Sequence, residues 1–291
     1  MRLEVHPPGI FYCGRIFAFS IQTMTVMDGL AQFKQAQRES WANFAPLEAI
    51  TTPAAAHLVR HAGVKAGLGV LDVGCGTGVV AITAARMGAR VAGVDLTPQL
   101  LERARENSRI AELEIDWREA DAEELPFPDS QFDIVLSQFA HMFAPRPEVA
   151  VSEMLRVLKP GGAIAFSTWP PELLVGRSMA LTARYLPPSP PGVAPPPLWG
   201  DPNIVRQRLG KGVEDIVFDR ASMLVPALSP QHFRRNVERT AGPLVKIVES
   251  LSASDPDRLR ALRQEFDAMV AEYLRENVVR QDYLLTRGRK I

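Results

Sequence analysis

The sequence predicts an α/β fold in which helices cover both faces of a mostly parallel sheet. Three observations support this fold class: apolar segments of strand length alternate with helix-patterned segments, capping and turn residues separate them, and 46% of the residues are hydrophobic. A chain of 291 residues is also long enough to bury a large core. We therefore expect a single domain over residues 28–291, preceded by a leader over residues 1–27.

Charge and cysteine content exclude several classes of protein. Lys and Arg together number 33, and so do Asp and Glu, so no excess of positive charge attracts nucleic acid. Cys13 and Cys75 lie far apart and form no CxxC pair, so we predict neither a disulfide framework nor a metal site. No apolar run has the length of a membrane span. We expect a cytoplasmic protein with a small-molecule partner and no metal.

Two helices are expected first, within residues 28–66. Apolar residues recur at near-helical spacing between residues 28 and 44, namely Leu30, Phe33, Trp41 and Phe44. The segment Thr51-Thr52-Pro53 predicts the start of a second helix, because proline is favoured in the first turn, where its missing N–H leaves no hydrogen bond unmade. We expect this second helix to reach about residue 61.

Strands and helices alternate over residues 67–169. The segments of strand character are residues 70–73, 91–95, 113–117, 132–137 and 163–168. Gly88 ends one of the intervening helices, Thr97-Pro98 begins the next, and Lys159-Pro160-Gly161-Gly162 turns the chain into the fifth strand. This alternation is typical of a parallel sheet whose faces are both covered by helices.

The pattern changes over residues 170–291. A helix-like stretch at residues 177–185 precedes a proline-dominated tract at residues 187–197, which cannot form a helix or a central strand. We interpret this tract either as an inert surface insertion or as a wall of the substrate pocket. Residues 213–225 alternate like a strand, helices follow through residues 258–277, and residues 282–289 form a last strand.

The most informative motif is a glycine loop after the first strand. It reads Val70-Leu71-Asp72-Val73-Gly74-Cys75-Gly76-Thr77-Gly78, an apolar strand that contains an acid and leads into three glycines at alternate positions. Glycine permits tight turns and close approach by a ligand. Dinucleotide-binding loops read GxGxxG and face a pyrophosphate. A GxGxG loop beside Asp72 is better suited to a ligand with a positive amino group.

This strand, acid and GxGxG loop resemble the first motif of the class I S-adenosylmethionine (SAM) methyltransferases. The resemblance continues in order with Asp95 at the end of the second strand, Asp121 after the third, and the segment Glu153-Met154-Leu155-Arg156-Val157-Leu158-Lys159-Pro160-Gly161-Gly162 before the fifth. It implies a Rossmann-like, seven-stranded sheet with an antiparallel last strand. It also implies SAM as cofactor, S-adenosylhomocysteine (SAH) as product, and a small-molecule acceptor, as in the group that includes quinone-biosynthesis C-methyltransferases.

The resemblance assigns the cofactor-binding residues. Asp72 binds the amino end of SAM, and its methionyl part packs on the loop formed by Gly74, Cys75, Gly76, Thr77 and Gly78. Asp95 accepts hydrogen bonds from the ribose hydroxyls, as acids that end the second strand do in nucleotide-binding folds. Leu96 lies against the adenine.

Two further groups of residues complete the expected site. Asp121 and Ala122 contact the adenine, with Glu123 and Glu124 as substitutes for the acid. Ligands bind at the carboxyl ends of strands in open α/β sheets. The residues at that end of the fourth strand, Ser137, Gln138 and Phe139, are therefore expected to border the reactive methyl group.

The expected chemistry depends mainly on positioning. A sulfonium already makes the methyl group electrophilic, so the protein has to hold the acceptor in line at about 3 Å and exclude water. If the acceptor must lose a proton, His141 is the candidate base, and its alternative role is packing. The expected substrate pocket is aromatic and suggests an apolar or aromatic acceptor, with Trp41, Phe44, Trp169, Tyr185 and Trp199 as its lining.

Two other functions are weighed against methyl transfer. An NAD(P)-dependent oxidoreductase would use the glycine loop and Asp95, but it explains neither the GxGxG spacing nor Asp121-Ala122. A module that binds SAM or SAH without turnover is the second alternative, because binding residues alone do not prove catalysis. The Asp/Asn-Pro-Pro-Tyr/Phe motif of amino-methylating nucleic-acid enzymes is missing after the fourth strand, where Ser137-Gln138-Phe139-Ala140 stands.

Overall fold

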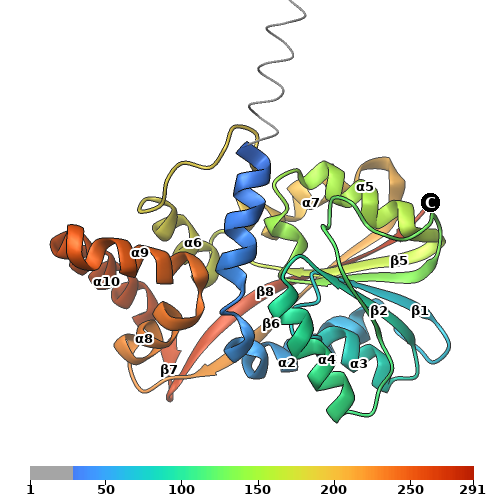
Figure 1. The fold of residues 1–291 in the computed structure, drawn as a ribbon, viewed down its shortest axis with the longest axis horizontal. Coiled ribbons are helices and arrows are strands. Elements are labelled where there is room, and N and C mark those ends of the chain that lie inside the picture. Colours follow the sequence, from blue (N-terminus) through green and yellow to red (C-terminus); the bar gives the residue numbers. More distant parts are fainter. Residues whose placement is uncertain (1–28) are drawn as a thin grey trace, which may run out of the picture.

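A central mixed sheet organises residues 29–291, which are the residues that this computed structural model describes (Figure 1). The strand order is β3-β2-β1-β4-β5-β8-β6, and β7 pairs with β8 beside this path. The expected leader over residues 1–27 lies outside the described residues. The strands are β1 (Gly69–Val73), β2 (Arg90–Asp95), β3 (Asp116–Glu119), β4 (Phe132–Gln138), β5 (Leu158–Thr168), β6 (Val213–Pro226), β7 (Leu274–Arg275) and β8 (Val278–Lys290).

Strand directions match the expected fold class. β1 to β5 run parallel, and β8 is antiparallel to both of its neighbours in the path. Val70 of β1 pairs with Val91 of β2 on one side and with Ile134 of β4 on the other. Between β1 and β4 the order of strands reverses, and ligands of open α/β sheets bind outside the carboxyl ends of the strands at such a point. The prediction of a mostly parallel sheet with an antiparallel last strand is confirmed.

Helices connect these strands and cover both faces. A helix over residues 29–41 comes first among the described residues. The α-helices that follow are α2 (Glu48–Ala62), α3 (Val79–Arg86), α4 (Pro98–Ile110), α5 (Pro147–Val157), α6 (Leu174–Ala183), α7 (Pro202–Leu209), α8 (Pro230–Thr240), α9 (Gly242–Ser254) and α10 (Pro256–Ala271). The short 3-10 turns are η1 (Ala45–Leu47), η2 (His141–Phe143), η3 (Pro196–Gly200) and η4 (Gly210–Gly212).

Neighbouring residues of β5 show which elements cover which face. Ser167 is paired with Gln138, and Gln138 Nε2 donates a hydrogen bond to Thr51 O of α2 at 3.1 Å. Phe166 points to the opposite face, because successive side chains of a strand alternate, and its ring packs on Trp199 of η3. Thus α2 covers one face of the sheet, and η3 covers the other.

Apolar side chains form two clusters. The larger cluster surrounds the sheet and includes Leu58, Leu71, Leu136 and Phe166. The second is built mainly by α6 and α8 to α10, together with the adjoining ends of β6 and β8. Figure 1 shows these helices grouped beside the sheet, with the blue helix 29–41 passing between the group and the strands. None of the helices described in residues 29–291 is long and apolar enough to cross a bilayer.

Several boundaries differ from the predictions. Helix α2 begins at Glu48 rather than at Thr51, so Pro53 lies inside it. The hydroxyls of Thr51 and Thr52 bond to carbonyls of the preceding turn, at 3.2 Å and 2.7 Å from Glu48 O. This local bonding accompanies a proline that removes one backbone donor from the helix.

Later boundaries also differ, and strand pairing explains those of β3 and α10. β3 spans Asp116–Glu119 instead of residues 113–117, since Asp116 is the residue that pairs with Ala92 of β2. α6 covers Leu174–Ala183 rather than residues 177–185. α10 ends at Ala271, well before residue 277, because β7 and a turn with positive φ at Glu276 and Asn277 lead into β8. The proline tract is irregular up to Pro195 and then enters η3.

Candidate functional site

The glycine loop joins β1 to α3 at the carboxyl edge of the sheet. Gly74, Gly76 and Gly78 have φ angles of 68°, 55° and 88°, which glycine adopts without strain. A Cβ on Gly74 would lie 2.3 Å from Ala140 Cβ, and one on Gly78 would lie 2.7 Å from the Trp117 ring. A Cβ on Gly76 would meet no described atom within 4 Å. Gly74 and Gly78 thus permit contacts within the protein, and Gly76 faces open space.

Hydrogen bonds from three sides fix this loop. Asp95 at the end of β2 accepts the Gly76 N–H at Oδ2 and the Thr97 N–H at Oδ1, both at 2.8 Å. Cys75 N–H donates to Val94 O at 2.9 Å, and Asn107 of α4 donates to Thr77 O at 3.0 Å. Asp95 is buried, and this burial raises its pKa, while the two N–H donors favour its charged form. Asp95 therefore orders the loop from the neighbouring strand.

One carboxylate oxygen of Asp72 receives no hydrogen bond from any described residue. Its Oδ2 accepts the Ala81 N–H from the first turn of α3 at 3.1 Å. Its Oδ1 is buried and has no hydrogen-bond partner among residues 29–291. Burial, with a smaller contribution from Asp95, raises the pKa of Asp72 to about 7. A bound cation would reverse this shift, so the oxygen suits the amino group that the sequence motif predicts.

The expected adenine acid lies in an ion-pair network after β3. Asp121 Oδ1 accepts the Glu123 N–H at 2.9 Å, and its Oδ2 lies 2.5 Å from Lys34 Nζ. The Glu123 carboxylate is 1% exposed and is bonded by Lys34 and by the side chain and backbone N–H of Arg146. Ala122 is half-buried beside them. Glu123 is therefore a buried member of this network, and Asp121 is the acid nearer to solvent.

The predicted residues at the end of β4 divide into different roles. Ser137 is fully buried; its hydroxyl donates to Val73 O at 2.8 Å and accepts the His141 N–H at 3.0 Å. Gln138 bonds to α2, as described above, and its Oε1 is buried without a described partner. Phe139 has a φ of 54°, unusual for a bulky residue, and its ring stacks on Trp169 at 4.0 Å between centroids. Ser137 thus joins β1 to η2.

His141 lies inside the protein. It is 1% exposed, and its ring packs against Phe166 and Trp199 at 4.5 Å and 4.6 Å between centroids. Neither ring nitrogen has a hydrogen-bond partner among the described residues. Burial, assisted by the charge of Arg208, lowers the pKa of His141 to about 3. The imidazole is therefore neutral at physiological pH, and it is not aimed at any described donor or acceptor.

The aromatic residues that were expected to line the pocket do not form one cluster. Trp41 packs on Phe44 and Phe143, Trp169 on Phe139 and Tyr283, and Trp199 on His141 and Phe166. Tyr185 packs on the second apolar cluster and lies below the Arg258 guanidinium, 5.1 Å away. Trp199 is 1% exposed. The structure therefore brings Trp169 to the end of β4 but places Trp199 and Tyr185 in other surroundings.

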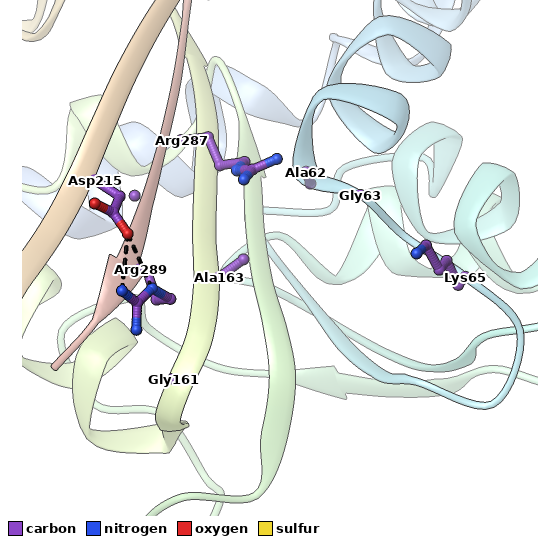
Figure 2. Close-up of a pocket in the computed structure, with 9 residues that line it drawn as sticks. Ala62, Gly63, Lys65, Gly161, Ala163, Asp215, Arg287 and Arg289 are labelled. Carbon is purple, nitrogen blue, oxygen red and sulfur yellow. Dashed lines mark hydrogen bonds and ion pairs between the residues drawn. The ribbon is translucent and has the colours of Figure 1, made fainter.

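Two cavities lie on the α2 side of β8. One, of about 310 Å³, is lined by Lys65, Arg287, Arg289 and Asp215 with small residues around them (Figure 2). The other, of about 370 Å³, is lined by His57, Arg60, His61, Asp219, Ala221 and Leu285. Figure 2 shows Arg289 directed at Asp215, with which it forms an ion pair. Neither cavity includes a predicted site residue.

Sequence reasoning missed three residues that shape the candidate site. Lys34 reaches Asp121 and Glu123 from helix 29–41, Trp117 fills the space beside Gly78 and Gly93, and Asn107 supports Thr77. Lys34 does have a sequence signal, since it shares one helical face with Gln37, Arg38 and Trp41 at spacings of three, four and seven residues. The other two depend on strand and helix placement and have no local signal.

Comparisons with known proteins agree with the resemblance in the sequence. Residues 71–166 match a family described as a methyltransferase domain. An uncharacterised protein of Mycobacterium tuberculosis is 36% identical over 257 residues, which cover 87% of this chain and 93% of that protein. A demethylmenaquinone methyltransferase of Tropheryma whipplei is 39% identical over 125 residues, or 43% of this chain and 52% of that enzyme.

A solved structure shares the fold. A candidate methyltransferase from Bacillus halodurans aligns with a TM-score of 0.54 at 21% identity, covering 81% of this chain and 98% of its own. The family match over residues 71–166 contains the glycine loop, Asp95, Asp121 and all of β4.

Proposed function

Because this chain belongs to the class I SAM-dependent methyltransferase family, we propose that it transfers the methyl group of SAM to a small organic acceptor. One observation carries the proposal: Asp72 Oδ1 has no hydrogen-bond partner among residues 29–291, and its strand leads into a glycine loop that is open at Gly76 and ordered by Asp95. A buried carboxylate oxygen without a donor is costly, and an ammonium group would satisfy it. Such a group is present at the amino-acid end of SAM.

The residues present fit the remaining parts of the cofactor. Asp95 Oδ1 and Oδ2 each keep acceptor capacity beyond one N–H bond, so the carboxylate can also accept the ribose hydroxyls. Leu96, half-buried after β2, supplies an apolar surface for the adenine, and Asp121 supplies an acceptor for its amino group. Gly74 and Gly78 keep the loop closed on Ala140 and Trp117, so that its backbone can pack on the methionyl part of the cofactor.

Positioning is the main contribution that we propose for the chain. SAM supplies an electrophilic methyl group on its sulfonium when bound. The aromatic group of Phe139, Trp169 and Tyr283 lies at the end of β4, which supports an apolar or aromatic acceptor that packs on rings and is kept from water. The Tyr283 hydroxyl is hydrogen-bonded to His57 Nδ1 at 2.8 Å. Of the predicted site residues, His141 has the least support, because its imidazole is neutral and buried.

Calorimetric titration with SAH tests the binding half of this proposal. We expect the wild-type protein to bind SAH and not NADH, and Asp72→Asn to weaken SAH binding about 10- to 100-fold, because a hydrogen bond between charged groups is lost. Asp133→Asn is a matched control, since Asp133 pairs with Lys159 and Gly69 N–H at the start of β4. NADH binding would contradict the proposal, and so would an SAH affinity that Asp72→Asn leaves unchanged.

Transfer itself needs a second experiment. Protein incubated with methyl-labelled SAM and a metabolite extract should yield a labelled small molecule, and the Asp72→Asn variant should yield far less. SAH binding without any labelled product would instead support the module that binds the cofactor without turnover. The chemical class of the labelled product tests the apolar or aromatic acceptor.

A further inference from the structure

Glu48, the first residue of α2, is bonded to α4 by its carboxylate. Its Oε1 accepts a hydrogen bond from Arg103 Nη2 at 2.7 Å, and its Oε2 accepts one from Asn107 Nδ2 at 3.0 Å. The Glu48 side chain is 23% exposed, so salt screens these contacts less than it screens a fully exposed ion pair. The hydrogen bond from Arg103 is the main cause that lowers the pKa of Glu48, and bonds with Asn107 and Thr77 lower it further. Glu48 is therefore an ionised acceptor at neutral pH.

Asn107 connects this carboxylate to the glycine loop. The same nitrogen, Nδ2, also donates to Thr77 O at 3.0 Å. A side-chain amide nitrogen has two N–H donors, so the bonds to Glu48 and Thr77 use both of them. Thr77 is buried, and its carbonyl shares a peptide group with the N–H of Gly78, which donates to Cys75 O at 2.9 Å. Asn107 thus holds the peptide group that closes the turn of the loop.

Glu48 fixes the orientation of the Asn107 amide. A carboxylate and a carbonyl can only accept hydrogen bonds. An amide oxygen turned toward Glu48 and Thr77 would bring three acceptors together without a donor. With Glu48 in place, two acceptors therefore demand the donating nitrogen, whereas Thr77 O alone would demand only one bond.

Two successive residues of the loop are held by two different elements. Asp95 at the end of β2 accepts the Gly76 N–H at 2.8 Å, and Asn107 of α4 donates to the next residue, Thr77. A Cβ on Gly76 would meet no described atom within 4 Å, so the open position of the loop lies at these two anchors. A loop that is ordered before binding loses less conformational entropy when its ligand arrives. Loss of the anchor at Thr77 should therefore lower the affinity for that ligand.

We propose that Glu48 is a positioning residue for the cofactor. Through Asn107 it holds the Thr77 carbonyl, and it thereby keeps the glycine loop in the shape that receives the amino-acid end of SAM. Glu48 acts through another residue, so this role requires no contact between Glu48 and the cofactor. The inference rests on the proposed function, because it concerns the same loop.

A double-mutant cycle in SAH affinity tests whether Glu48 acts through Asn107. We expect Glu48→Ala and Asn107→Ala each to weaken SAH binding about three- to tenfold, the size of a typical net hydrogen-bond contribution. The double variant should then bind SAH within about twofold of Asn107→Ala, because one pathway is already broken. Losses that multiply would overturn the proposal. They would assign the effect of Glu48 to the first turn of α2 itself, where Thr51 O accepts from Gln138 at 3.1 Å.

Glu238→Ala is the matched control for a general loss of stability. Glu238 of α8 accepts from Arg263 through Nε and Nη2, as Glu48 does from Arg103, and it also accepts from a second donor, Arg234. Its side chain is 11% exposed, so we expect Glu238→Ala to lower the free energy of unfolding at least as much as Glu48→Ala. SAH affinity of the control should stay within about twofold of wild type. An equal loss of affinity in the control would overturn the role of Glu48.

The amide resonance of Gly78 gives a readout that is independent of affinity. Its nitrogen shares a peptide group with the Thr77 carbonyl, so a change in the hydrogen bond to that carbonyl shifts the resonance. In protein without SAH, Glu48→Ala should shift the Gly78 resonance in the same direction as Asn107→Ala does, and Glu238→Ala should leave it in place. An unchanged resonance in Glu48→Ala would overturn the link from Glu48 to the loop.

Failure of the proposed function gives a different result from failure of this inference. If folded wild-type protein does not bind SAH, the proposed function is rejected, and the positioning of a cofactor by Glu48 is rejected with it. If wild type binds SAH and Glu48→Ala binds it equally well, only the role of Glu48 is overturned.

Discussion

Ionisation of Asp72 and ligand binding are coupled at a single buried oxygen. Burial raises the pKa of this carboxyl from 3.8 to about 7, so the folded protein favours its protonated form. The stability that this group contributes is present below pH 3.8 and is lost as the pH rises through about 7. A positively charged amino group requires the opposite, ionised form, so its binding must release a proton below pH 7.

SAH affinity should therefore depend on pH through Asp72. We expect the affinity to rise as the pH increases toward about 7, by up to about tenfold per pH unit, and to level off above it, because deprotonation no longer opposes binding there. Titrations at several pH values between about 5.5 and 8.5 measure this. The Asp72→Asn variant has no proton to release, so a matching slope in that variant would assign the pH dependence to another group.

The second prediction at the residue scale concerns His141. Its two nitrogens are buried without described partners, so His141→Leu should leave the free energy of unfolding unchanged or raise it by about 1 kcal/mol, because unpaired polar groups are removed. With an acceptor found by labelled transfer, kcat should stay within about threefold, since a catalytic base typically contributes at least about 100-fold. Denaturant unfolding and steady-state kinetics check the two expectations. A loss of kcat of that larger size with a normal KM would restore His141 as a base.

At the scale of elements, helix 29–41 and α9 approach so closely that the residue at the contact, Gly242, has no room for a side chain. A Cβ on Gly242, in the first turn of α9, would lie 2.2 Å from Ser40 Oγ and 2.3 Å from Ser40 O. Such distances require backbone movement, since real Cβ atoms do not approach this closely. Gly242 is thus the position where the second apolar cluster and helix 29–41 are fitted together.

Gly242→Ala should separate these two helices. We expect it to lower the free energy of unfolding by about 1–3 kcal/mol, the usual cost of overpacking, as measured by denaturant titration. Gly212→Ala is the control, because its added Cβ would meet Leu155 at an ordinary 3.5 Å. Equal stability of the two variants would mean that helix 29–41 adjusts freely to α9.

At the scale of the whole molecule, the candidate site is assembled by elements that are distant in sequence. Asp72 and Asp95 come from adjacent parallel strands, while Lys34 arrives from a helix that precedes the sheet and also touches α9. The second apolar cluster joins the sheet through β6 and β8, whose residues take part in both clusters. Helix 29–41 therefore contacts both parts of the molecule.

The sequence by itself determined the fold class and singled out the acids of the candidate site. The period of the apolar residues predicted the order of strands and helices. Asp72, the GxGxG loop and Asp95 could be proposed from the sequence because they follow one another along two successive strands and the helix between them. Strand ends such as that of β3 were less accurate, since the pairing of Asp116 with Ala92 sets them and the partner strand is remote in sequence.

Only the tertiary structure decided which neighbours surround each of these residues. It showed that Gly74 and Gly78 accommodate Ala140 and Trp117, that His141 is enclosed by Phe166 and Trp199, and that Lys34 holds Asp121. The physical reason is that hydrogen bonds, burial and steric contact depend on distances between side chains from different elements. A linear pattern specifies the residue type and its element, but the neighbours that set its charge and exposure are brought to it by folding.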